Sequence, residues 1–169
     1  MIEVTLETLQ MSLASPHRVV VLREVAVERY LPIWIGPCEA DAIANRLNHV
    51  EIPRPQTHDL LVSLLDTLDA DLLYIYINAL ADDNTFFLAR LVLDVNAQSV
   101  EVDCRPSDAI AIAVRLGAPI YVAEEVMDEA GVFPERDLIP QGQEDKDLEV
   151  FRDFLSTLDT DVSPSNKDS

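Results

Sequence analysis

Acidic residues and an arginine stand at alternating positions in one short segment, at Glu101, Asp103 and Arg105. Residues 99–104 alternate between apolar and polar types, a pattern that predicts a β-strand. Because successive side chains of a strand point to opposite faces, we expect the two acids and the arginine on one face, about 6.6 Å apart. Carboxylates in such a place can hold a divalent metal or position a water, and arginine can bind a phosphate. The segment is therefore a candidate for chemistry on an anionic group.

A second candidate segment surrounds Arg54, which has a proline on each side. The two prolines predict an extended loop that presents the arginine. A helix predicted for residues 57–68 follows, so His58 and Asp59 lie in its first turn, beside backbone N–H groups that have no partner within the helix. In that position His58 can carry a proton and Asp59 can bind a metal, while Arg54 can bind a phosphate.

Each of these residues also has a structural interpretation. Asp103 and Arg105 can form an ion pair along one face of the strand. Arg54 can be a buried clamp on a carboxylate, and Asp59 can stabilise the helix dipole. His58 can be a surface histidine without a role.

An internal repeat places these segments in a common framework. Residues 37–47 align with residues 106–116 at an offset of 69, and seven of the eleven pairs are identical. Both copies begin with proline and are followed by Asn48 or Gly117, which is typical of an α-helix with defined ends.

Matched positions in the two copies separate residues that the fold needs from those that it does not. Glu39 and Asp108 match near the helix N-termini, so we expect capping for both, although Asp108 is also a candidate metal ligand. Arg46 and Arg115 match near the C-termini, where they can stabilise the dipole or form ion pairs.

Two of the candidate residues break the repeat. Asp103 stands where the first copy has Trp34, and Arg105 stands where it has Gly36. A residue that only the fold requires should recur in both copies, so this asymmetry favours a function for Asp103 and Arg105.

The elements around the repeat predict an α+β fold. Three strands are expected before each repeated helix, at residues 3–13, 18–24 and 30–35, then at 72–79, 85–94 and 99–104. The expected architecture is a mixed β-sheet built from two strand-strand-strand-helix repeats, with the helices packed against it. The helix at residues 57–68 has Thr57 as its expected N-cap. Its apolar face is formed by Leu60, Leu61, Leu64, Leu65 and Leu68.

The last part of the chain follows the predicted domain as an extension and a tail. A short strand at 119–122 and a helical turn at 124–130 complete the predicted domain, residues 1–131. Residues 132–158 form a C-terminal extension, with an amphipathic helix expected at 146–158. Residues 159–169 are expected to be a disordered acidic tail.

Three motifs resemble the bifunctional nuclease family, a group long known only as a domain of unknown function. They lie at residues 30–37, 53–61 and 102–111, in the family's order. The resemblance covers about residues 5–131. It implies a compact α+β fold, an oligomer that is commonly a dimer, and nuclease activity on RNA and DNA, but it assigns no catalytic residue.

The composition limits the mode of binding. The chain has 169 residues, with 31 acidic and 12 basic residues and a net charge of −19. A net negative charge excludes a protein that covers nucleic acid with its whole surface.

The sequence shows no signal peptide and no long apolar stretch, so we expect a cytoplasmic protein without membrane contact. Cys38 and Cys104 have no metal-type spacing and are expected to be buried free thiols.

The favoured function is a nuclease that hydrolyses phosphodiester bonds of RNA, DNA or both. A divalent metal, Mg²⁺ or Mn²⁺, would assist the reaction. His58, Asp59 and Asp103 are the predicted catalytic residues, and Arg54 and Arg105 the predicted phosphate-binding residues. The predicted metal ligands are Asp59, Asp103 and Asp108. The alternative is a non-catalytic homo-oligomer, a dimer or larger, that binds a small anionic ligand or a protein partner.

Overall fold

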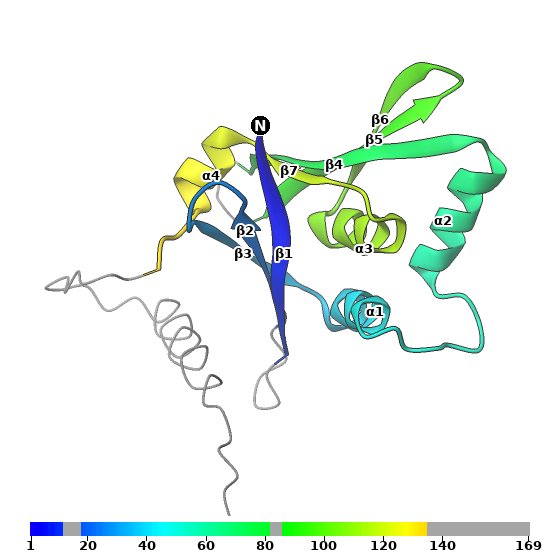
Figure 1. The fold of residues 1–169 in the computed structure, drawn as a ribbon, viewed down its shortest axis with the longest axis horizontal. Coiled ribbons are helices and arrows are strands. Elements are labelled where there is room, and N and C mark those ends of the chain that lie inside the picture. Colours follow the sequence, from blue (N-terminus) through cyan, green and yellow to red (C-terminus); the bar gives the residue numbers. More distant parts are fainter. Residues whose placement is uncertain (12–17, 82–85, 135–169) are drawn as a thin grey trace, which may run out of the picture. The chain divides into compact units, whose positions relative to one another are not determined.

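Seven strands form one mixed sheet in the computed structural model, which describes residues 1–11, 18–81 and 86–134. The strands are β1 (Ile2–Met11), β2 (Arg18–Glu24), β3 (Tyr30–Ile35), β4 (Ala70–Leu80), β5 (Phe87–Val95), β6 (Gln98–Cys104) and β7 (Ile120–Val122). Their order is β3-β2-β1-β7-β4-β5-β6, and β4 with β7 is the parallel pair (Figure 1). The predicted α+β class with a mixed sheet is therefore confirmed.

Four helices accompany the sheet in the described residues. They are α1 (Pro37–Leu47), α2 (Thr57–Thr67), α3 (Pro106–Leu116) and α4 (Glu124–Ala130). The chain thus follows the order strand-strand-strand-helix twice, with α2 between the halves; that the halves are structural copies stays a prediction. Within Met1–Phe133, which forms one compact unit, α1 and α3 lie side by side (Figure 1).

The core lies between the sheet and these helices. Alternate residues of the strands are buried there, such as Val20 and Leu22 on β2 and Ile75 and Ile77 on β4. On α3, every residue from 109 to 113 is buried, and three of the five are alanines. Such small side chains let α3 approach both α1 and the sheet closely, which burial of a helix on several sides requires.

Helix α2 corrects two predictions. Its N-cap is Gln56 and not Thr57, because the Gln56 side chain and Asp59 form a capping box. The expected apolar face is mostly exposed: Leu60, Leu64 and Leu68 are at least half exposed. Of the predicted face, Leu65 packs against the core, and Val62 and the buried His58 complete the packed side of the helix. The first turn of α2 forms polar contacts with α3, described below, and these contacts favour the observed orientation of the helix.

The remaining predictions of this kind concern the C-terminal segments, the two cysteines and membrane contact. The expected helix at 146–158 and the tail at 159–169 lie outside the described residues. Cys38 is exposed, which corrects its predicted burial, and Cys104 is half-buried. Within residues 1–11, 18–81 and 86–134, no helix has the length and apolar character needed to span a bilayer.

A two-residue turn joins β5 to β6. Asn96 has φ 53° and Ala97 has φ 61°, so both residues are left-handed, as in a type I′ turn. Asparagine tolerates this region, but the Cβ of alanine is strained there.

We predict that Ala97→Gly stabilises the protein by about 1 kcal/mol, because glycine relieves the strain at positive φ. Urea unfolding followed by circular dichroism measures the change. Asn96→Gly is the matched control and should change stability less, since asparagine already suits its position. A lower stability of Ala97→Gly would contradict the assigned turn.

Candidate functional site

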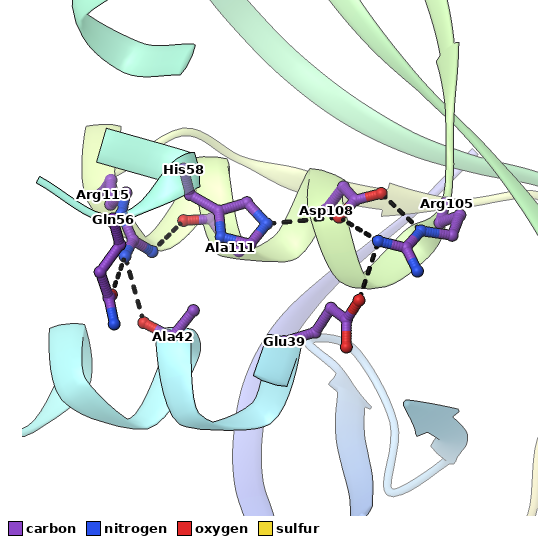
Figure 2. Close-up of polar contacts among 8 residues, drawn as sticks. All are labelled: Glu39, Ala42, Gln56, His58, Arg105, Asp108, Ala111 and Arg115. Atoms are coloured by element: carbon purple, nitrogen blue, oxygen red, sulfur yellow. Dashed lines mark hydrogen bonds and ion pairs between the residues drawn. The ribbon is translucent and has the colours of Figure 1, made fainter. Parts of the chain in front are cut away.

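Arg105 forms the centre of a group of charged side chains at the start of α3. Strand β6 ends at Cys104, and Arg105 is the N-cap of α3, with extended backbone. Its side chain turns back to Asp108, with Nε donating to Oδ2 at 2.7 Å and Nη2 to Oδ1 at 2.9 Å. Nη2 also lies 2.9 Å from Oε1 of Glu39, in the first turn of α1 (Figure 2). One guanidinium therefore joins the first turns of two helices.

His58 completes this group, which we call the Arg105 cluster: Glu39, His58, Arg105 and Asp108. Its Nε2 lies 3.3 Å from Oδ1 of Asp108, and the residue is only 7% exposed (Figure 2). The contact joins the first turn of α2 to the first turn of α3. The prediction of a surface histidine without a role is therefore wrong, because the imidazole is buried against a carboxylate.

The parallel orientation of α1 and α3 places the positive ends of both helix dipoles at the cluster. The first turns of α1 and α3 meet through Glu39 and Arg105, and their last turns meet where Arg46 donates to the carbonyl oxygen of Arg115 at 3.2 Å. The two helices therefore run in the same direction, with both positive dipole ends at the cluster. Acids at one end and arginines at the other compensate the parallel dipoles.

The carboxylates of Glu39 and Asp108 bind Arg105 in addition to their place at the positive helix ends. Glu39 and Asp108 lie in the first turns of α1 and α3, where the sequence predicted them, and both carboxylates also bind Arg105. Burial alone would raise the pKa of Asp108, but the hydrogen bonds from Arg105 and His58 lower it overall. The same ion pair raises the pKa of Arg105, so the guanidinium stays charged.

Arg115 binds three helices together from a buried position. Its side chain is 5% exposed, and its Nε donates to Oδ1 of Asp59 at 2.6 Å. Nη2 donates to Gln56 Oε1 at 3.1 Å and to the Ala42 carbonyl at 3.3 Å, and Nη1 donates to the Ala111 carbonyl at 2.8 Å (Figure 2). These partners satisfy a charge that would otherwise be costly to bury.

Asp59 is therefore a structural residue in this fold. Its second oxygen accepts the backbone N–H of Gln56 at 2.8 Å, which completes the capping box. The hydrogen bond from Arg115 lowers the pKa of Asp59, against the opposing effect of burial. The predicted roles of Asp59 in catalysis and metal binding stay predictions, and its carboxylate is already occupied on both oxygens.

The remaining candidates lie apart from the cluster's contacts. Asp103 is paired in register with Arg90 of β5, and Arg90 forms an ion pair with Glu101. Asp103 does not pair with Arg105, which has left the strand. Arg54 is exposed in the loop before α2, so the alternative of a buried clamp is wrong, while phosphate contact stays a prediction.

The predicted metal ligands do not form a common site. Asp59 binds Arg115, Asp108 binds Arg105 and His58, and Asp103 lies on β6. In the described part of the chain, no three histidine, cysteine, aspartate or glutamate side chains are grouped so as to hold a metal ion. The triad predicted from the sequence therefore does not fit a single Mg²⁺ or Mn²⁺.

Thiol chemistry is also disfavoured near the cluster. Burial, together with the charges of Asp108 and Asp103, raises the pKa of the Cys104 thiol to about 11. A thiol with this pKa is protonated at neutral pH and is a weak nucleophile.

Sequence reasoning missed two partners. It expected Glu39 as a cap and Arg115 as a dipole or ion-pair residue, but it named neither of the charged partners that they contact on other elements. The repeat held a signal for Glu39: glycine at position 36, where the second copy has Arg105, leaves room beside the acid. No signal in the sequence identified Asp59 as the partner of Arg115.

Comparison with known proteins shows the family of this chain. Residues 20–135 match the bifunctional nuclease domain, a span that includes every member of the Arg105 cluster. The chain belongs to this family. The predicted resemblance is confirmed.

Relatives of the family occur in bacteria and plants. An uncharacterized protein of Mycobacterium tuberculosis is 42% identical over 151 residues, which cover 85% of this chain and 86% of the relative. Bifunctional nuclease 2 of Oryza sativa subsp. japonica is 30% identical over 139 residues, covering 78% of this chain and 42% of the plant protein. Bifunctional nuclease 1 of Oryza sativa subsp. indica is 25% identical over 117 residues, which cover 67% of this chain and 35% of the plant protein.

We predict that Arg115→Ala lowers the free energy of unfolding by about 3 kcal/mol or more, because it leaves Asp59 and Gln56 without their buried partner. Arg46→Ala is the matched control at the equivalent position of α1. That side chain is exposed, so its loss should cost less than about 1 kcal/mol. Equal losses in chemical denaturation would show that Arg115 does not hold the helices together.

The lowered pKa of Asp59 predicts a pH dependence of stability. A carboxyl group with a lower pKa in the folded state stabilises it above the unfolded value, about pH 3.9, and this contribution disappears as the pH falls through the folded pKa. Asp59→Asn should therefore be less stable than the wild type at pH 7, and the difference should shrink below about pH 4. Asp66→Asn, an exposed change on the same helix, should show no such convergence. A constant difference across pH would contradict the role of the Asp59 charge.

Proposed function

We propose that this protein is a nuclease that hydrolyses phosphodiester bonds of RNA, DNA or both, and that Arg105 binds the reacting phosphate. Membership of the bifunctional nuclease domain family supports the activity. The names of the plant relatives, which are called bifunctional nucleases, also support it.

One observation carries the assignment of the site. The side chain of Arg105 is 66% exposed, although two carboxylates hold it in a fixed position. An exposed and oriented guanidinium at two positive helix ends suits a phosphate, because arginine binds phosphate through two parallel hydrogen bonds. Arg115 is equally oriented, but it is buried and donates four hydrogen bonds to protein groups.

The cluster also supplies a group for proton transfer. Hydrolysis forms a bond from a water oxygen to phosphorus and breaks the bond to the leaving oxygen. One proton leaves the water and one reaches the leaving oxygen. We assign this transfer to His58, whose ring Asp108 orients through the 3.3 Å contact. Arg105 stabilises the negative charge that develops on the phosphate.

Other features predicted from the sequence remain part of this proposal. Asp103 as a catalytic residue and Arg54 as a second phosphate contact need separate variants. A divalent metal stays a prediction, and no step is assigned to it because the three predicted ligands do not meet. Homo-oligomerisation and a cytoplasmic location also stay predictions.

The test is cleavage of fluorescein-labelled single-stranded RNA and DNA by the purified protein. Arg105→Ala and His58→Ala should each lower the rate at least about 100-fold, since each removes a group that acts in the transition state. Arg46→Ala removes the same charge from the end of α1 away from the cluster and should retain the rate. Parallel purification of all variants controls for contaminating nucleases.

The outcomes separate the alternatives. Cleavage that persists in both Arg105→Ala and His58→Ala would contradict the assigned site. Loss of cleavage in EDTA, with recovery in Mg²⁺ or Mn²⁺, would support the predicted metal, and unchanged cleavage would contradict it. No cleavage by the wild type, combined with thermal stabilisation by mononucleotides without metal, would favour the non-catalytic anion-binding alternative.

A further inference from the structure

Glu39 and Asp108 share Arg105, but they hold it differently. Asp108 accepts hydrogen bonds from two nitrogens of the guanidinium and is itself bonded to His58, whereas Glu39 lies against Nη2 alone. We infer that Glu39 competes with the substrate phosphate for Arg105, so that nucleic acid must displace the Glu39 carboxylate to bind tightly. This inference rests on the proposed function, because it concerns the same arginine.

The position of Glu39 depends on a missing side chain. A Cβ built on Gly36 would lie 2.2 Å from Oε2 of Glu39, much closer than any normal contact. The glycine therefore provides the space in which the carboxylate reaches Arg105. The backbone at Gly36 has φ −69° and ψ 156°, which alanine adopts without strain, so this space can be filled by a single methyl group.

The two halves of the chain explain why the contact is asymmetric. Gly36 and Glu39 occupy the positions that Arg105 and Asp108 occupy in the second half. A single arginine thus serves two acidic positions, and Asp108 also has a second partner in His58. Asp108 holds two nitrogens of Arg105, so it can keep the arginine oriented when Glu39 is displaced, whereas the Glu39 charge then competes with the substrate.

Electrostatics gives the direction of the effect. A phosphate that approaches Arg105 is attracted by one guanidinium and repelled by two carboxylates. The side chain of Arg105 is 66% exposed and that of Glu39 is 17% exposed, so solvent screens the ion pair mainly on the arginine side, while a phosphate can accept two hydrogen bonds from arginine. Displacement of Glu39 is therefore feasible, but it reduces the observed affinity by the fraction of molecules in which Arg105 is available.

Three variants separate this local effect from the overall charge of the protein. Glu39→Gln removes the competing charge. Gly36→Ala displaces the carboxylate from Arg105 and leaves the net charge unchanged. Asp41→Asn is the matched control, because it removes one negative charge from an exposed position on the same helix, two residues from Glu39.

The measurement is fluorescence anisotropy of a short nuclease-resistant phosphorothioate DNA at low salt, with the wild type, these variants and Arg105→Ala. If Arg105 is available in about a tenth to a third of molecules, Glu39→Gln and Gly36→Ala should each lower Kd about 3- to 10-fold. Asp41→Asn should change Kd less than twofold, and Arg105→Ala should raise it. Thermal unfolding of each variant verifies that the fold is retained.

Each contrary result has a distinct meaning. If Arg105→Ala weakens binding but Glu39→Gln and Gly36→Ala do not tighten it, the competition is wrong and the proposed site stands. An equal gain from Asp41→Asn would overturn the inference in favour of general charge. If Arg105→Ala leaves binding unchanged, both the competition and the phosphate-binding role of Arg105 fail.

Discussion

The buried guanidinium of Arg115 is the constraint on which the arrangement of the helices depends. A charge that is 5% exposed must find partners for its donors, and it finds them on α1, α2 and its own helix. The loop before α2 must therefore bring Gln56 and Asp59 to α3. This requirement places the polar side of the first turn of α2 against α3, and it leaves much of the leucine-rich side of α2 in solvent.

The same requirement places the candidate site. Once Asp59 is bound near the end of α3, its neighbour His58 points toward the beginning of that helix and contacts Asp108. The parallel packing of α1 against α3 then adds Glu39, so that three first turns meet around one exposed arginine. The arrangement of the cluster thus depends on how the buried charge of Arg115, near the other end of α3, finds its partners.

A net charge of −19 is compatible with a nucleic-acid substrate under these conditions. The attraction comes from a local group, Arg105 at two positive helix ends, and not from the surface as a whole. Binding of this kind involves few phosphate contacts and weakens when salt screens the exposed arginine. The carboxylates around Arg105 limit it further, since they orient the arginine and also reduce its net charge.

The sequence by itself determined the elements and the family. Periodicity, prolines and helix stops predicted the four helices and seven strands of the described residues to within two residues, because these signals act between near neighbours. It also selected His58, Asp108 and Arg105 as candidates. The pair of Arg105 with Asp108 joins residues three positions apart, but only the tertiary structure decided the other partners: Arg105 also pairs with Glu39, and Asp59 binds Arg115. Ion pairs between residues more than 50 positions apart depend on how the helices pack, and patterns within a short segment do not predict that packing.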